Sequence, residues 1–150
     1  MSTARRLAGV LVTLVVLGGL LAASADAKLV RYSGKTGQGK KVVLRTNAKG
    51  KAQYFTIQFR ADCLRGHIDD GRERFVPPFR RADYGGFVDG GHARNPIKGY
   101  GIGRFRVHIE GERVDRDHVK GTFDFQARYF HHGEAINRCS AQNVHWSVSR

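Results

Sequence analysis

The chain has 150 residues, of which 41% are hydrophobic, and its formal net charge is +13. This length argues for a single domain and against a multidomain enzyme, and the hydrophobic content argues against a wholly disordered chain. The charge alone names no partner.

The beginning of the chain has the pattern of an export signal. Two arginines precede an uncharged apolar run of 15 residues, and small residues follow as far as Ala27. This order is typical of a secretory signal peptide, whereas a membrane anchor would need about 20 apolar residues. We expect residues 1–27 to be removed, with Ala25 as the alternative cleavage point, and residues 28–150 to form one secreted or cell-surface-associated domain.

Cys63 and Cys139 are the two cysteines of the chain. In an oxidising compartment, two thiols in one small domain normally pair. A nucleophilic thiol or a metal ligand is the alternative, but a metal cage needs further thiolates or histidines close by. We expect a structural disulfide between Cys63 and Cys139.

The apolar residues recur with period two, which predicts β-strands. The clearest case is residues 52–63, where Phe55 and Phe59 share one face with the other apolar side chains. A second strand at residues 40–47 and a turn at residues 48–51 complete a predicted hairpin.

The neighbouring segments are less regular. We expect a short first strand at residues 28–33, a flexible connection at 34–39, a loop at 64–72, an extended edge segment at 74–81 and a turn-rich stretch at 83–91. The edge assignment depends on two consecutive prolines, which are excluded from a central strand.

Residues 103–130 predict a second hairpin, with its turn at residues 112–116. We expect Ile109 to lie opposite Val119, because this register places apolar residues on the inner face. The outer pairs would then be Glu110 with His118 and Arg104 with Asp124.

A last strand is predicted at residues 143–149, with Val144, Trp146 and Val148 on one face. No segment has helical periodicity. The fold class is therefore all-β, a single antiparallel β-sandwich or small β-barrel of about seven or eight strands with one disulfide.

His131, His132 and Glu134 form the densest cluster of ligand-type residues. Such residues could hold a transition metal, which would suit a small extracellular metal-dependent hydrolase. Adjacent histidines on a strand point to opposite faces, so these two could share a metal only in a loop. The alternative interpretation is a polar loop after a long strand, without a metal. We expect no cofactor and assign no catalytic residue.

Three glycines, Gly99, Gly101 and Gly103, share the parity of the inward residues that follow. Their missing side chains leave room for a bulky ring, of which Trp146 is the largest available. The alternative is a pocket in a small-ligand-binding barrel.

The basic residues give the remaining indication of function. Arg104, Arg106 and Lys120 are predicted to share an outer face, and Arg80 and Arg81 lie in the edge segment. Basic and aromatic side chains together can bind a polyanion or a glycan. We therefore expect a non-enzymatic secreted β-domain whose partner is an acidic cell-wall polymer, a glycan or another polyanion.

The C-terminal part also resembles a recurring pattern. Gly121-Thr122-Phe123 is followed by Cys139 and then by Val144-His145-Trp146. This is similar to the G-x-F, Cys and V-x-W pattern of small, uncharacterised secreted β-rich proteins of actinobacteria, except that Ala141 stands where a glycine is usual. The resemblance implies a signal peptide, a sandwich-like domain and a disulfide, and it implies no activity.

Overall fold

A computed structural model describes residues 29–82, 86–98 and 101–150. The predicted signal peptide, residues 1–27, lies outside the described residues. The described part contains nine strands: β1 (Val30–Thr36), β2 (Lys41–Thr46), β3 (Ala52–Cys63), β4 (His67–Phe75), β5 (Arg80–Arg81), β6 (Phe87–Ile97), β7 (Gly101–Arg113), β8 (His118–His131) and β9 (Glu134–Ser149). The predicted all-β class is confirmed, with more strands than expected.

The strands form one antiparallel sheet in the order β4-β3-β2-β1-β9-β8-β7-β6-β5. The first and last strands are neighbours, since Ser33 of β1 lies opposite Ser149 of β9. The end of β3 also pairs with β9, where Cys63 lies opposite Cys139. Because of this second pairing, the sheet partly closes on itself.

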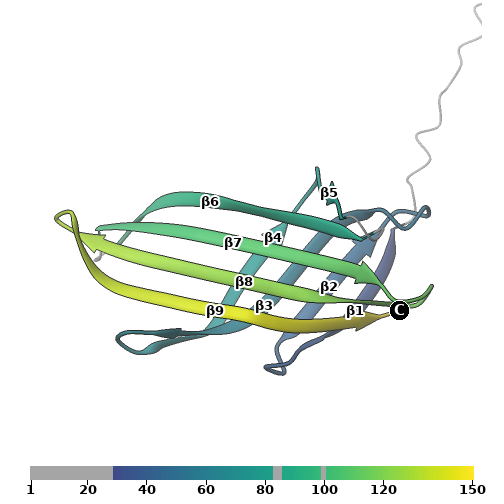
Figure 1. Ribbon diagram of the computed structural model, residues 1–150, viewed down its shortest axis with the longest axis horizontal. Coiled ribbons are helices and arrows are strands. Elements are labelled where there is room, and N and C mark those ends of the chain that lie inside the picture. Colours follow the sequence, from purple (N-terminus) through teal and green to yellow (C-terminus); the bar gives the residue numbers. More distant parts are fainter. Residues whose placement is uncertain (1–28, 83–85, 99–100) are drawn as a thin grey trace, which may run out of the picture.

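The sheet folds into two layers that face each other across an aromatic core. In Figure 1 the long strands β6–β9 run along the molecule, and β1–β4 cross behind them. Phe55 of β3 has its ring 4.8 Å from that of Trp146 and 6.0 Å from that of Phe87. Further along β3, the Phe59 ring is 4.8 Å from that of Phe123 on β8. These buried rings hold the two layers together.

The predicted strand at residues 52–63 coincides with β3. The hairpin between β2 and β3 is also confirmed, and Gly50 in its turn has φ +76°, a conformation that glycine adopts without steric cost. Apolar alternation identified this hairpin because one face of each strand is buried.

The prediction of a loop at residues 64–72 was wrong, since β4 begins at His67 and pairs with β3. The strand was missed because Gly71 occupies an inner-face position where an apolar residue would be expected. A Cβ built on Gly71 would lie 2.7 Å from the ring of Phe59, so that ring fills the space.

Glycines also interrupt the apolar alternation in two further strand segments, which were therefore not predicted as strands. Residues 87–91 of the predicted turn-rich stretch belong to β6, which pairs with β7 along its whole length, whereas residues 83–85 lie outside the described residues. Within the expected flexible connection, Gly34 belongs to β1, and a Cβ there would lie 2.0 Å from the carbonyl oxygen of Ser147. Here glycine permits close strand pairing and leaves no alternation to recognise.

The second hairpin exists, but its predicted register was wrong by four residues. Ile109 lies opposite Phe123, not Val119, and Arg104 lies opposite Arg128, not Asp124. The shift is even, so the inner and outer faces remain as predicted. The last strand is also longer than predicted, because β9 begins at Glu134.

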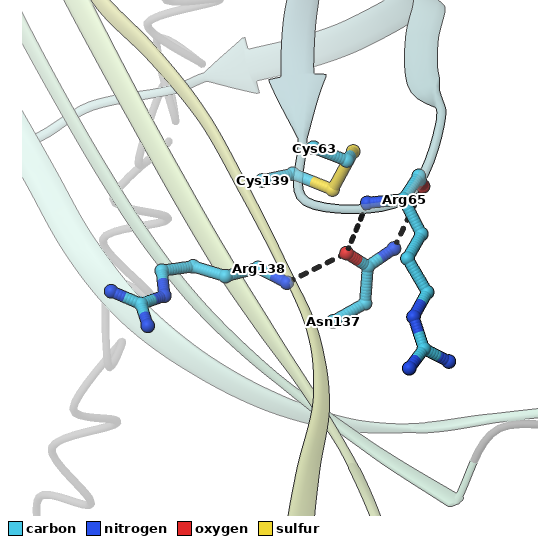
Figure 2. Close-up of a disulfide and its surroundings, with 5 residues drawn as sticks. All are labelled: Cys63, Arg65, Asn137, Arg138 and Cys139. Carbon is cyan, nitrogen blue, oxygen red and sulfur yellow. Dashed lines mark hydrogen bonds between the residues drawn. A yellow bond between two sulfur atoms is a disulfide. The ribbon is translucent and has the colours of Figure 1, made fainter.

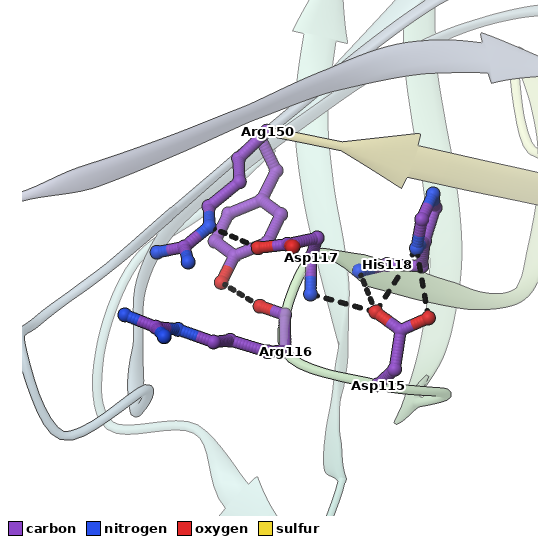
Figure 3. Close-up of polar contacts among 6 residues, drawn as sticks. Asp115, Arg116, Asp117, His118 and Arg150 are labelled. Atoms are coloured by element: carbon purple, nitrogen blue, oxygen red, sulfur yellow. Dashed lines mark hydrogen bonds and ion pairs between the residues drawn. The ribbon is translucent and has the colours of Figure 1, made fainter.

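The turn between β7 and β8 explains the register. The carboxylate of Asp115 accepts hydrogen bonds from the backbone amides of Asp117, at 2.7 Å, and His118, at 2.8 Å. His118 Nδ1 lies 2.9 Å from the same carboxylate, and Arg150 pairs with Asp117 (Figure 3). This short turn brings Val119 opposite Arg113 and sets the pairing of the two strands.

We expect the Asp115→Asn variant to melt at a lower temperature than the wild type at pH 7. Hydrogen bonds from the backbone amide of Asp117 and from His118 lower the pKa of Asp115. Its ionised form therefore stabilises the fold above the unfolded-state pKa, about 4, and this contribution is lost as the pH falls through the lower folded-state value. Thermal melts from pH 7 to pH 2 would show the variant and wild type converging in acid.

Asp62→Asn is the matched control for this experiment. The Asp62 side chain is exposed and has no hydrogen bond or ion pair with any described residue. A control that shifts the melts as strongly as Asp115→Asn would contradict the proposed role of the Asp115 turn.

Candidate functional site

Four arginines form a continuous row across the outer face of β6–β9. Arg94 lies opposite Arg104, Arg104 opposite Arg128, and Arg128 opposite Arg138. All four side chains are exposed. We call Arg94, Arg104, Arg128 and Arg138 the arginine row.

The row concentrates positive charge without local compensation. Among the described residues, none of its four guanidinium groups has a carboxylate partner within 4.0 Å. Like charges directly opposite each other on neighbouring strands are destabilising. The row therefore costs stability in the isolated protein, and a bound anion would relieve that repulsion.

An aromatic side chain lies beside the row. The guanidinium carbon of Arg104 is 4.7 Å from the centre of the Phe130 ring, within the range of a cation–π interaction. Phe130, Arg128 and Arg138 border a hollow of about 190 Å³ together with Leu64, whose side chain is 73% exposed. The site thus combines cations with exposed apolar surface.

The disulfide and an asparagine clamp hold the β9 end of this site, as Figure 2 shows. Cys63 and Cys139 are bonded as predicted. Asn137 Oδ1 accepts a hydrogen bond from the Arg65 amide, and Asn137 Nδ2 donates one to the Arg65 carbonyl, both at 3.2 Å. The amide of Leu64 donates to the carbonyl of Arg138 at 2.9 Å. These bonds tie the β3–β4 turn to β9 and fix the backbone of Arg138.

The predicted basic residues do not all meet at one place. Arg104 and Arg106 share the outer face of β7, as expected from their parity. Lys120 lies opposite Glu112, and roughly 26 Å of strand separates it from Arg128.

Arg80 and Arg81 lie on β5, beside the beginning of β6. Arg80 is opposite Val88, so roughly 20 Å of strand separates it from the position of Arg94. The structure therefore brings Arg104 and Arg106 together but places Arg80, Arg81 and Lys120 away from the arginine row.

Sequence reasoning missed three members of the arginine row. Arg94 lies in a segment for which no strand was predicted, and Arg138 precedes the predicted last strand. Arg128 has the parity of the predicted outer residues of β8, so the sequence did indicate that it faces outward. The wrong register, however, placed Asp124 opposite Arg104 instead of Arg128.

The histidine cluster forms a tight turn. His131 ends β8 opposite Glu134, and His132 and Gly133 between them have φ 48° and 90°. The rings of His131 and His132 are 4.2 Å apart. Within residues 29–82, 86–98 and 101–150, no three His, Cys, Asp or Glu side chains group as metal ligands.

The inward glycine of the Gly99–Gly103 segment is filled by a ring. A Cβ on Gly103 would lie 2.6 Å from the ring of Phe105, whereas Gly99 lies outside the described residues. Trp146 packs elsewhere, over Gly121, where a Cβ would lie 2.6 Å from its ring. The missing side chain of Gly103 thus serves ring packing, although the ring there is that of Phe105 and not that of Trp146. Gly101 was predicted to face inward but is exposed, and a Cβ there would lie 2.3 Å from the carbonyl oxygen of Phe130.

None of the described residues forms a helix long and apolar enough to cross a membrane. Comparison of the chain with protein-family models, with curated proteins and with solved structures found no match. The site must therefore be interpreted from its own geometry.

Proposed function

We propose that this protein is a binding module for linear polyanions and that the arginine row is its binding surface. The single observation that carries this proposal is the unbroken alignment of four exposed arginines across four neighbouring strands, without carboxylate partners among the described residues.

The spacing of the row suits a chain of anionic groups. Neighbouring strands lie about 4.8 Å apart, so the row extends roughly 14 Å across the sheet. Each guanidinium group can donate two parallel hydrogen bonds to one phosphate, sulfate or carboxylate group. A polymer with regularly placed anions can therefore occupy several arginines at once, and Phe130 offers apolar contact beside them.

The proposed place of action is outside the cytosol. The Cys63–Cys139 disulfide is stable in oxidising compartments and rare in the reducing cytosol. This supports the prediction of secretion or cell-surface association, where acidic wall polymers and anionic glycans are candidate partners. The proposed role is binding without catalysis.

A matched pair of variants tests the arginine row. One variant replaces Arg94, Arg104, Arg128 and Arg138 with Gln. The other removes the same charge from exposed cations elsewhere, by Lys49→Gln, Lys51→Gln, Lys98→Gln and Arg116→Gln. We expect the row variant to elute from heparin resin at a clearly lower salt concentration than the control variant.

Titration with duplex DNA gives a second readout for the same pair. The slope of log affinity against log salt concentration should fall in magnitude by about 3 to 4 in the row variant, because about 0.9 counterion is released for each phosphate neutralised. Equal slopes and equal elution of the two variants would mean that general charge, not the row, accounts for binding, and would overturn the proposal.

A further inference from the structure

We propose a second anion site, separate from the arginine row, that binds a single phosphate or sulfate group on the outer face of β1–β4. A hollow of about 170 Å³ opens there, and four cations line it: Arg31, Lys41, Arg45 and Arg72. Tyr54 and Thr56 of β3 also line the hollow. Together with Arg74, these residues are called the Tyr54 cluster.

Strand pairing brings the Tyr54 cluster together. Arg31 lies opposite Arg45, and Arg45 lies opposite Tyr54. One step along β3, Thr56 lies opposite Arg74 of β4. The aromatic core separates this layer from β6–β9, so the cluster and the arginine row face opposite sides of the molecule.

The arginines are held in place over Tyr54. The guanidinium carbon of Arg74 lies 4.8 Å from the centre of the Tyr54 ring, and that of Arg45 lies 5.5 Å from it. Such stacking restricts the side chains before any ligand binds, which lowers the entropy cost of binding.

No carboxylate neutralises the cluster. Among the described residues, none of its cations forms an ion pair. Asp70 pairs with Lys40 at 2.9 Å and Asp69 with Arg60 at 3.2 Å, whereas Glu73 lies opposite the buried Ile57 on the inner face. The positive charge of the cluster is thus available to a ligand.

A buried hydroxyl without a partner lies within the cluster. Thr56 is 7% exposed, and its Oγ1 has no hydrogen-bond partner among the described residues. A buried polar group without a partner is unfavourable, so such groups are rare in folded proteins. Thr56 lines the bottom of the hollow, at the surface of the sheet. An oxyanion that enters between the guanidinium groups can therefore accept a hydrogen bond from the Thr56 hydroxyl group.

The pKa of Tyr54 is consistent with a site that binds an anion. Its pKa is lowered, first by the nearby Thr56 hydroxyl and then by Arg74, Arg72 and Arg45, against an opposing effect of burial. The Thr56 hydroxyl acts on the phenol from close by, although Thr56 Oγ1 makes no hydrogen bond of normal geometry with any described residue. The cluster therefore favours negative charge at its centre.

A compact tetrahedral oxyanion fits these donors best. Several guanidinium groups, an ammonium group and a hydroxyl converge on one small hollow. A phosphate or sulfate group presents three or four charged oxygens to such donors, whereas a carboxylate presents two. The size of the hollow favours one group over a polymer chain.

Isothermal titration of the protein with inorganic phosphate and with inorganic sulfate tests the site. We expect saturable binding that weakens about tenfold in each of two variants, Arg72→Gln and Thr56→Val. Thr56→Val keeps the shape of the side chain and removes only the unpartnered hydroxyl, so its melting temperature should equal or exceed that of the wild type.

Arg106→Gln is the matched control, since it removes one exposed charge from the opposite face. It should bind phosphate as the wild type does, and Thr56→Val should keep the wild-type elution from heparin. The absence of saturable binding in the wild type, or equal weakening in Arg106→Gln, would overturn the site. Neither result would bear on the arginine row.

Glycerol phosphate distinguishes two sources of the anion. If it binds as tightly as inorganic phosphate, the site accepts phosphate esters, such as those of a polymer or a lipid headgroup. If only inorganic phosphate binds, the site takes the free ion. Either result supports the site, and the binding of each anion that binds the wild type should weaken about tenfold in Arg72→Gln.

Discussion

Replacing Cys63 and Cys139 with alanine is expected to lower the free energy of unfolding by up to about 4 to 5 kcal/mol. The bond joins residues separated by 76 positions, so its loss frees a long loop in the unfolded chain. It also removes the covalent link at the point where β3 meets β9 and the sheet partly closes. Urea denaturation followed by circular dichroism would measure the change.

Reduction of the wild type serves as the control for the cysteine variant. Wild type with a reducing agent should unfold at a midpoint near that of the double alanine variant, and the reducing agent should leave the variant unchanged. The Leu64–Arg138 and Asn137–Arg65 hydrogen bonds remain in both cases but lose their covalent support. A double alanine variant with the same midpoint as the oxidised wild type would contradict the prediction and would show that these bonds and the core suffice to keep the sheet closed.

Truncation of Leu44 to alanine is expected to cost about 2 to 5 kcal/mol of stability. Leu44 is 1% exposed and lies opposite Tyr32 on one side and Phe55 on the other. Phe55 in turn contacts Trp146 in the opposite layer. The cavity left by Leu44→Ala would therefore loosen the aromatic contacts that join the two layers, and the same denaturation experiment would measure it.

The chain offers a control with the same chemistry. Leu64→Ala removes the same atoms from a side chain that is 73% exposed, so its effect should stay within about 0.5 kcal/mol. The backbone hydrogen bond of Leu64 to Arg138 does not depend on the side chain. Similar losses in the two variants would contradict the assignment of the core between the layers.

The strands that could be predicted from sequence are those with one buried face. The prediction gave the first and last residues of β3 correctly, and it gave the buried and exposed faces of β7 and β8 correctly. It succeeded because inner apolar residues such as Phe59 and Ile109 alternate with polar ones. β4 and β6 could not be recognised, because Gly71, Gly90 and Gly91 interrupt the pattern, and pairing with a neighbour holds these strands in place.

The functional surfaces were harder to predict than the strands. The parity of Arg104 and Arg106 places them on an outer face, and the structure agrees. Parity could not show that Arg94, Arg128 and Arg138 lie beside Arg104, because the turns between these consecutive strands decide which residues lie opposite one another. The Tyr54 cluster likewise draws its residues from four strands.

The amino-acid sequence by itself determined which side of each regular strand is buried, the all-β class and the pairing of the two cysteines. The tertiary structure alone decided which residues lie opposite one another. The physical reason is that side-chain direction along a strand is local and repeats every two residues, whereas register is set by turns and by packing between distant strands. The Asp115 turn sets a register between β7 and β8 that differs by four residues from the predicted one. In the observed register, Arg128 lies opposite Arg104.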